Sequence, residues 1–380
     1  MKTINFIIFF AVFFGVYLGS SAMVIKHVMN LLKPYKIKYL VLALMLLFSL
    51  GIILGRFFAN YIPLELSAFF TRIGFVWMSL LTYSFIYSLA FWLLRRFDLI
   101  RISESNGLKI FIVELFIYIG IFLIGYYIAV NPVITRHEIK ITKKFNSPLR
   151  IVQLSDLHLG FMYTESMFEK VIDKVEKINP DLVLISGDFL ENENAYAEKK
   201  NIGKSVNRLK PKYGMFFSPG NHEYINDINK SLKYIQSLNI NILRDSTVMI
   251  DKDIYLIGKD DESAPRFGNF KLKPLDELLP RTHIDDNANL PLIVLMTHQI
   301  KNHHDYVDKG LDLVISGHTH HGQFFPWNLI VKLIFDIAYG YEKWGDTNFY
   351  VSSGTGFWGP PFRLGTRSEI VVFDLISVSE

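Results

Sequence analysis

Residues 311–320 read LDLVISGHTH, an apolar run that ends in a glycine and two histidines one residue apart. A short apolar run of this kind predicts a buried strand, and Gly317 allows the chain to turn sharply at its end. His318 and His320 should then face the same side just beyond the strand, where open α/β sheets keep their sites. Because neutral imidazole is a common ligand of transition metals, the stretch predicts a metal site. A His-x-His pair alone is equally typical of packing histidines, so the other motifs decide.

Other predicted strands also end in side chains that can bind metal. Buried strands are predicted at residues 149–154, 181–186, 213–217, 254–257 and 292–296, a half-buried strand at 135–142, and helices at 167–178 and 225–238. The polar residues that follow these strands are Asp156, His158, Asp188, Asn221, His222 and His298. Strands that alternate with helices predict an α/β domain with its site at the strand ends.

The mixture of ligand types indicates the kind of metal. Oxygen and nitrogen donors together suit Mn, Fe or Zn better than Mg, which prefers oxygen alone. Two neighbouring cations repel each other, so a bridging carboxylate is expected between them. Asp188 is the natural bridge, and the Asn221 amide can ligate without adding charge.

Taken together, these motifs resemble one family. Asp156-x-His158, Gly187-Asp188, Gly220-Asn221-His222-Glu223, His298 and Gly317-His318-x-His320 are similar to the calcineurin-like metallophosphoesterases, in that family's order. The resemblance implies a four-layer α/β/β/α sandwich and two divalent metal ions, with Mn expected and Fe or Zn as alternatives. It implies one metal on Asp156, His158, Asp188 and His320, and the other on Asp188, Asn221, His298 and His318. It also implies that His222 is a catalytic, unmetallated histidine that donates a proton or hydrogen bond to the phosphoryl or leaving oxygen; the alternative is a packing histidine.

The N-terminal third has a different composition. Long apolar runs occupy residues 4–25, 39–55, 73–94 and 110–130, the last broken by Glu114. Each is close to the ~20 residues that span a bilayer. We therefore expect an all-α bundle of four transmembrane helices in residues 1–132 and the catalytic domain in residues 133–380. The first run could instead be a signal peptide.

The side of the membrane that carries the catalytic domain stays open. Lysine and arginine in the first and third connections favour a catalytic domain outside, whereas Arg136, Lys140 and Lys143 after the fourth run favour the opposite. We expect a multi-pass protein of a bacterial inner membrane. Within the spans, Glu114 and Arg72 could pair, but snorkelling of both to the interface is the favoured interpretation.

Composition excludes several other classes. The chain has no cysteine, which excludes disulfides, thiolate metal sites and a cysteine nucleophile. The net charge is +4 over 380 residues, without the basic stripe typical of nucleic-acid binding. We expect no nucleic-acid partner.

The substrate is predicted from the segment that follows the two histidines. Residues 324–335 read FFPWNLIVKLIF, and Phe324, Phe325 and Trp327 are expected to form a groove or membrane-facing lip for acyl chains. The alternative is a core helix. Arg363 lies in a tail that resembles membrane-associated or exported bacterial phosphodiesterases, and it is the fourth predicted substrate residue.

Three functions remain in view. The first is hydrolysis of a lipid-linked phosphodiester or pyrophosphate, with UDP-2,3-diacylglucosamine as the candidate substrate and the bilayer as partner. The second is an extracytoplasmic phosphodiesterase that acts on envelope lipids or polymers. The third is an inactive membrane sensor or scaffold, against which the complete ligand set argues.

Overall fold

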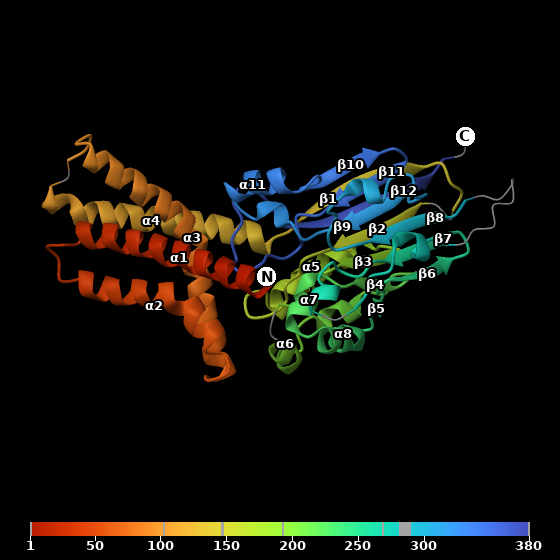
Figure 1. Ribbon diagram of the computed structural model, residues 1–380, viewed down its shortest axis with the longest axis horizontal. Coiled ribbons are helices and arrows are strands. Elements are labelled where there is room, and N and C mark those ends of the chain that lie inside the picture. Colours follow the sequence, from red (N-terminus) through yellow and green to blue (C-terminus); the bar gives the residue numbers. More distant parts are fainter. Residues whose placement is uncertain are drawn as a thin grey trace. The chain divides into compact units, whose positions relative to one another are not determined.

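The computed structural model describes residues 2–101, 103–145, 148–191, 194–267, 270–280 and 290–378. The chain divides into two compact units (Figure 1). The helical unit comprises Met1–Tyr126 and Gly359–Pro361, and the catalytic unit comprises Tyr127–Trp358 and Phe362–Glu380.

The helical unit contains the four predicted apolar runs as helices. These are α1 (Lys2–Leu31), α2 (Lys38–Phe57), α3 (Leu64–Arg96) and α4 (Gly107–Val130), with a short 3-10 turn, η1 (Glu104–Asn106), before α4. All four are long and apolar enough to cross a membrane. A helix satisfies every backbone N–H and C=O within its own segment, which is what a segment in lipid requires.

Small residues let α2 and α3 approach closely. A Cβ on Gly74 would lie 2.2 Å from the backbone nitrogen of Ile52, and one on Gly51 would lie 2.7 Å from the carbonyl oxygen of Phe70. Across the same contact the Ser67 hydroxyl donates to the carbonyl oxygen of Gly55 at 2.7 Å. Close backbone packing and interhelical hydrogen bonds are how helices associate in lipid, where apolar burial offers no preference.

Glu114 does not snorkel, contrary to expectation. Its carboxylate is buried in the helical unit, and its Oε1 lies 3.1 Å from Nε2 of His27 on α1. A buried carboxylate needs such a partner. The two residues are 87 positions apart, so the pair depends on helix packing and has no local sequence signal.

The catalytic unit is built on two six-stranded sheets. The first has the order β1 (Val133–Ile141), β12 (Glu369–Ser377), β2 (Leu149–Leu154), β3 (Leu182–Ser186), β4 (Met215–Ser218), β5 (Asn241–Ile242). The second has the order β10 (Gly340–Trp344), β11 (Thr347–Val351), β9 (Leu313–Ser316), β8 (Leu292–Met296), β7 (Ile254–Gly258), β6 (Ser246–Asp251). Strands β2, β3 and β4 run parallel to one another, as do β7, β8 and β9. Strand β12 is antiparallel to β2, and β6 is antiparallel to β7.

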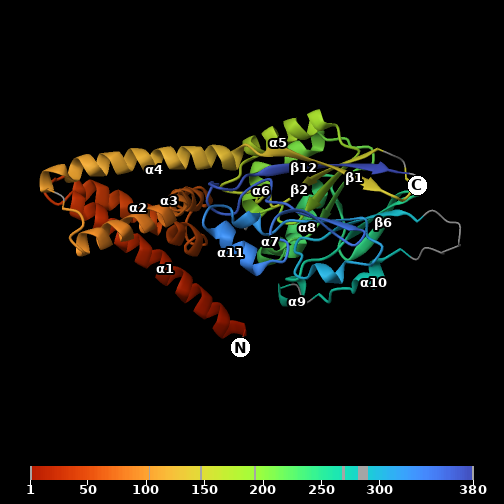
Figure 2. The ribbon, with the colours of Figure 1, turned by 90° about the horizontal axis from the view of Figure 1, so that it is seen from above.

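One apolar core joins the two sheets. It contains Ile151 and Leu184 from the first sheet and Leu256, Val294 and Ile315 from the second. The α-helices of this unit are α5 (Glu165–Ile178), α6 (Asn194–Lys200), α7 (Asn221–Asn226), α8 (Ile228–Ser237), α9 (Ala264–Phe267), α10 (Leu275–Leu278) and α11 (Trp327–Ile334). Figure 2 shows α5 on one side of the sheets and α9 and α10 on the other. The predicted α/β sandwich is confirmed.

Two local predictions differ from the structure. The helix expected at residues 225–238 is divided into α7 and α8 at Asp227, which has φ 125° and whose carboxylate accepts from the backbone nitrogens of Asn229 and Lys230. This N-cap starts a new helix at Ile228. Strand β12, which was not predicted, lies between β1 and β2.

Candidate metal centre

The predicted ligands follow strands from both sheets, and glycines bring these strand ends together. A Cβ on Gly187 would lie 2.2 Å from Nδ1 of His298, and one on Gly317 would lie 2.2 Å from Oδ2 of Asp156. Only a glycine permits these approaches. The sequence Gly-Asp after β3 and Gly-His after β9 is therefore required by the geometry of the site.

The ligand loops have unusual backbone conformations. Left-handed φ values occur at Asp156 (52°), His158 (47°), Asp188 (52°), His318 (72°) and His320 (48°). Such conformations cost free energy in residues other than glycine, and they persist at functional sites where the surrounding structure enforces them.

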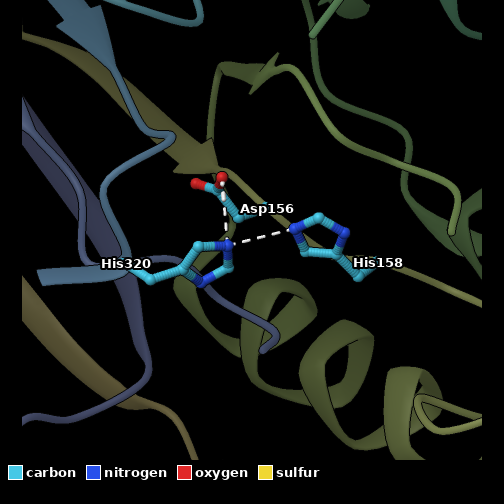
Figure 3. A group of neighbouring side chains, drawn as sticks. All are labelled: Asp156, His158 and His320. Carbon is cyan, nitrogen blue, oxygen red and sulfur yellow. Dashed lines mark hydrogen bonds and ion pairs between the residues drawn. The ribbon is translucent and has the colours of Figure 1, made fainter. Parts of the chain in front are cut away.

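The first cluster is formed by Asp156, His158 and His320 (Figure 3). Nε2 of His320 lies 3.0 Å from Nε2 of His158 and 3.5 Å from Oδ1 of Asp156. The Asp156 carboxylate also accepts from the Ser155 hydroxyl and from the backbone nitrogen of His318. Two imidazole nitrogens and a carboxylate oxygen thus converge on one point, which is the arrangement a cation requires.

The second cluster is formed by Asp188, His298 and His318. Oδ2 of Asp188 lies 3.1 Å from Nε2 of His298 and 3.7 Å from Nε2 of His158. Asp188 therefore stands between the two clusters, where the expected bridge belongs. Burial lowers the pKa of His318 to about 3, which keeps its imidazole neutral and its lone pair available.

Asn221 is the remaining predicted ligand. It opens α7, and its Oδ1 is buried without a hydrogen-bond partner among the described residues. Buried polar atoms in native proteins nearly always have a partner, so this oxygen indicates a site for a bound group. The donor set and this orphaned oxygen fit two divalent cations, which when bound would neutralise phosphoryl charge and activate water for attack.

Glu191 supports the first cluster and was not predicted. Its Oε2 lies 2.9 Å from Nδ1 of His158, which fixes the ring and leaves Nε2 directed at Asp156 and His320. Carboxylates commonly orient metal-binding histidines in this way. Although burial disfavours the charged ring, Glu191 raises the pKa of His158. A carboxylate three positions after Asp188 was the signal available in the sequence.

Glu223 holds the backbone of the loop that carries Asp188. Its Oε2 accepts from the backbone nitrogens of Asp188 (3.1 Å) and Gly220 (2.9 Å), and its Oε1 accepts from those of Phe189 (2.9 Å) and Leu190 (3.2 Å). Burial raises the pKa of Glu223 to about 7, while four N–H donors favour its ionised form. The residue belongs to the quoted Gly-Asn-His-Glu motif, but its role comes from the structure.

His222 lies beside both clusters. Its ring contacts that of His158 edge-on at 4.6 Å, and its backbone nitrogen donates to Oδ1 of Asp188 at 2.9 Å. Burial lowers the pKa of His222, so the imidazole is neutral at pH 7. Nδ1 lies 3.8 Å from Oε2 of Glu191 and has no hydrogen-bond partner among the described residues. His222 therefore lies at the edge of both clusters with a neutral ring, and its catalytic role stays a prediction.

Arg363 does not face a substrate. It is fully buried, its Nη2 donates to the carbonyl oxygens of Ser353 (2.6 Å) and Gly356 (2.9 Å), and its Nη1 donates to that of His320 (3.2 Å). These bonds tie the C-terminal tail to the His320 turn. We therefore assign Arg363 to positioning His320, in place of the predicted substrate contact.

Two adjoining histidine–carboxylate clusters lie at the strand ends of an α/β sandwich, with Asp188 of the second cluster 3.7 Å from His158 of the first. This arrangement is typical of one class of protein, the dinuclear metallohydrolases. Residues 149–322 match the family described as calcineurin-like phosphoesterase. An uncharacterized metallophosphoesterase of Helicobacter pylori is 32% identical over 371 residues, 94% of each chain. A second, from Campylobacter jejuni, is 35% identical over 265 residues, 68% of each chain. The chain belongs to the calcineurin-like metallophosphoesterases and is a metal-dependent phosphoesterase.

A vertebrate relative shares the membrane character. The Danio rerio transmembrane protein with metallophosphoesterase domain is 31% identical over 232 residues, which cover 58% of this chain and 52% of that protein. With the four apolar helices, this similarity indicates membrane association.

Proposed function

We propose that this enzyme crosses a bacterial inner membrane four times and cleaves a lipid-linked phosphodiester or pyrophosphate. The reaction would use two divalent metal ions, of which manganese is the favoured candidate. The observation that carries the proposal is an exposed apolar helix beside the metal ligands.

That helix is α11, and it is not part of the core. None of its residues is buried, and the exposed fractions are 45% for Trp327, 51% for Leu329 and 87% for Leu333. Phe325, just before it, is 50% exposed. Contiguous exposed apolar surface of this kind marks an interaction site. The core-helix alternative is therefore wrong, and a lipid-facing role is supported.

The helix is attached to the ligands at both ends. It packs on the 3-10 turn η4 (His320–Gly322), where a Cβ on Gly322 would lie 2.4 Å from the backbone nitrogen of Asn328. After its C-terminus, the Phe335 ring lies 5.9 Å from the His318 ring. An acyl chain lying along α11 would therefore carry its headgroup phosphate to the metal ligands.

The connection to the helical unit is short. Helix α4 ends at Val130 and β1 begins at Val133, so two residues separate the last apolar helix from the first strand. A tethered enzyme meets lipid at high effective concentration. This supports a membrane lipid as the substrate partner.

UDP-2,3-diacylglucosamine is our leading substrate, because it joins acyl chains to a pyrophosphate. Water would add across the pyrophosphate, which yields UMP and a lipid phosphate. The second candidate is an extracytoplasmic phosphodiesterase acting on envelope lipids or polymers, favoured by the basic first and third connections. A topology reporter fused to the C-terminus separates them, since the nucleotide-linked lipid is cytoplasmic.

The test compares a lipid with a soluble ester. Full-length enzyme in detergent micelles is assayed on UDP-2,3-diacylglucosamine and on bis(p-nitrophenyl) phosphate. Phe325→Ser with Trp327→Ser should raise KM for the lipid about tenfold or more, because each buried methylene contributes ~0.8 kcal/mol, and should leave the soluble ester nearly unchanged. Met249→Ser, an exposed site on β6 at the far edge of the second sheet, is the matched control. Equal loss on both substrates would refute the lipid-facing role of α11.

A further inference from the structure

The helical unit contains a large cationic pocket, and none of its described lining residues belongs to the metal centre. Its volume is about 920 Å³, and it lies between α1 and α3 near their C-terminal ends and the start of α4. Ligand pockets typically occupy about 300–1,000 Å³. The pocket is therefore large enough for a phosphorylated headgroup and part of its chain.

The charged residues that line the pocket are all basic. Lys26, Lys33, Arg95 and Arg96 line it, and none of its described lining residues is acidic. The whole chain has a net charge of only +4, so these four cations form a pronounced local concentration. Basic pockets between membrane helices are a known arrangement for anionic headgroups.

The Glu114 carboxylate beside the pocket is already engaged. His27 lines the pocket, and its Nε2 lies 3.1 Å from Oε1 and 3.2 Å from Oε2 of Glu114. The His27 ring also packs edge-on against Phe91 of α3 at 4.6 Å. Because the Glu114 carboxylate is paired with His27, it repels an anion in the pocket less than an unpaired carboxylate would.

Apolar and polar groups stand beside the cations. Phe91, Trp92 and Leu89 contribute apolar surface, and Asn30 and Ser103 contribute hydrogen-bonding groups. Tryptophan is enriched where a membrane meets water. The lining thus offers charge to a phosphate and apolar contact to what the phosphate carries.

We propose that this pocket binds a phosphate-bearing anion, whose phosphate belongs either to the headgroup of an anionic phospholipid or to a soluble phosphoester. The site is separate from the metal ligands, so the proposal does not depend on the substrate of the enzyme. Arginine and lysine at the pocket supply the affinity through charge-assisted hydrogen bonds.

The experiment measures quenching of tryptophan fluorescence by brominated lipid in full-length protein in neutral detergent. Brominated phosphatidylglycerol should quench at lower concentration than brominated phosphatidylcholine. Lys26→Gln with Arg95→Gln should weaken the phosphatidylglycerol effect roughly 10- to 30-fold, since each basic group near a membrane contributes ~1 kcal/mol.

Lys36→Gln with Arg101→Gln is the matched control. It removes two charges that follow α1 and α3 in the chain, at exposed residues that do not line the pocket, and should change the affinity less than twofold. Unchanged melting temperature and unchanged bis(p-nitrophenyl) phosphate hydrolysis show that both variants are folded. A soluble arm adds glycerol 3-phosphate: displacement of the lipid assigns the pocket to soluble phosphoesters, and no displacement assigns it to lipid.

Two results would overturn the proposal. Equal quenching by the two lipids would show that the pocket does not recognise an anion. Equal weakening by the pocket and control variants would show that general surface charge, and not the pocket, attracts the lipid.

Discussion

Replacement of Glu223 by glutamine should damage the metal centre without touching a metal ligand. The carboxylate accepts four backbone hydrogen bonds, two on each oxygen. Glutamine keeps one carbonyl oxygen and places an NH₂ donor against two of the N–H groups. Each buried, unsatisfied N–H costs about 1–3 kcal/mol, so the variant should lose roughly 2–6 kcal/mol.

The loss should be concentrated at the bridge. Whichever way the glutamine amide is oriented, it faces backbone N–H groups of the Asp188 loop or of Gly220. We therefore expect a lower free energy of unfolding in chelator and, in addition, weaker metal binding. Urea denaturation with and without Mn, together with metal analysis of the purified protein, measures both.

The matched control is Glu262→Gln. Glu262 is an exposed residue that pairs with Lys301 at 3.3 Å, and exposed pairs contribute about 0–1 kcal/mol. If Glu223→Gln changes stability and metal content no more than this control, the carboxylate does not hold the two loops and the reasoning fails.

The remaining predictions concern metal, chemistry and helix packing. Asp188→Ala should lose both metals in metal analysis, because the carboxylate lies between the clusters; retention of two metals would contradict the bridging role. His222→Ala should keep its metal and lose about 10²–10⁴-fold in turnover of bis(p-nitrophenyl) phosphate, the range for a positioned acid–base group; metal loss would instead make His222 a ligand. Gly74→Ala should destabilise the helical unit by about 1–3 kcal/mol through overpacking, whereas Gly120→Ala, with nothing within 4 Å of its added Cβ, should not. Equal melting temperatures for these two variants would argue against the close contact of α2 and α3.

The sequence by itself determined the two-part architecture and the chemistry of the site. The apolar runs became α1 to α4 because a span depends on local composition and length alone. Strands such as Leu149–Leu154 and Leu292–Met296 have the predicted limits. A short apolar run bounded by polar residues is typical of a buried strand, so its ends can be predicted from the sequence. The ligand types were evident because each follows such a strand.

Only the tertiary structure decided which groups meet. His27 with Glu114, Glu191 with His158, and Arg363 with the His320 turn join residues far apart in the chain. Residue type and spacing predict how one segment is buried, but not which distant segment packs against it. The exposure of α11 shows the same limit, because an apolar helix has the same sequence pattern whether protein or lipid covers it.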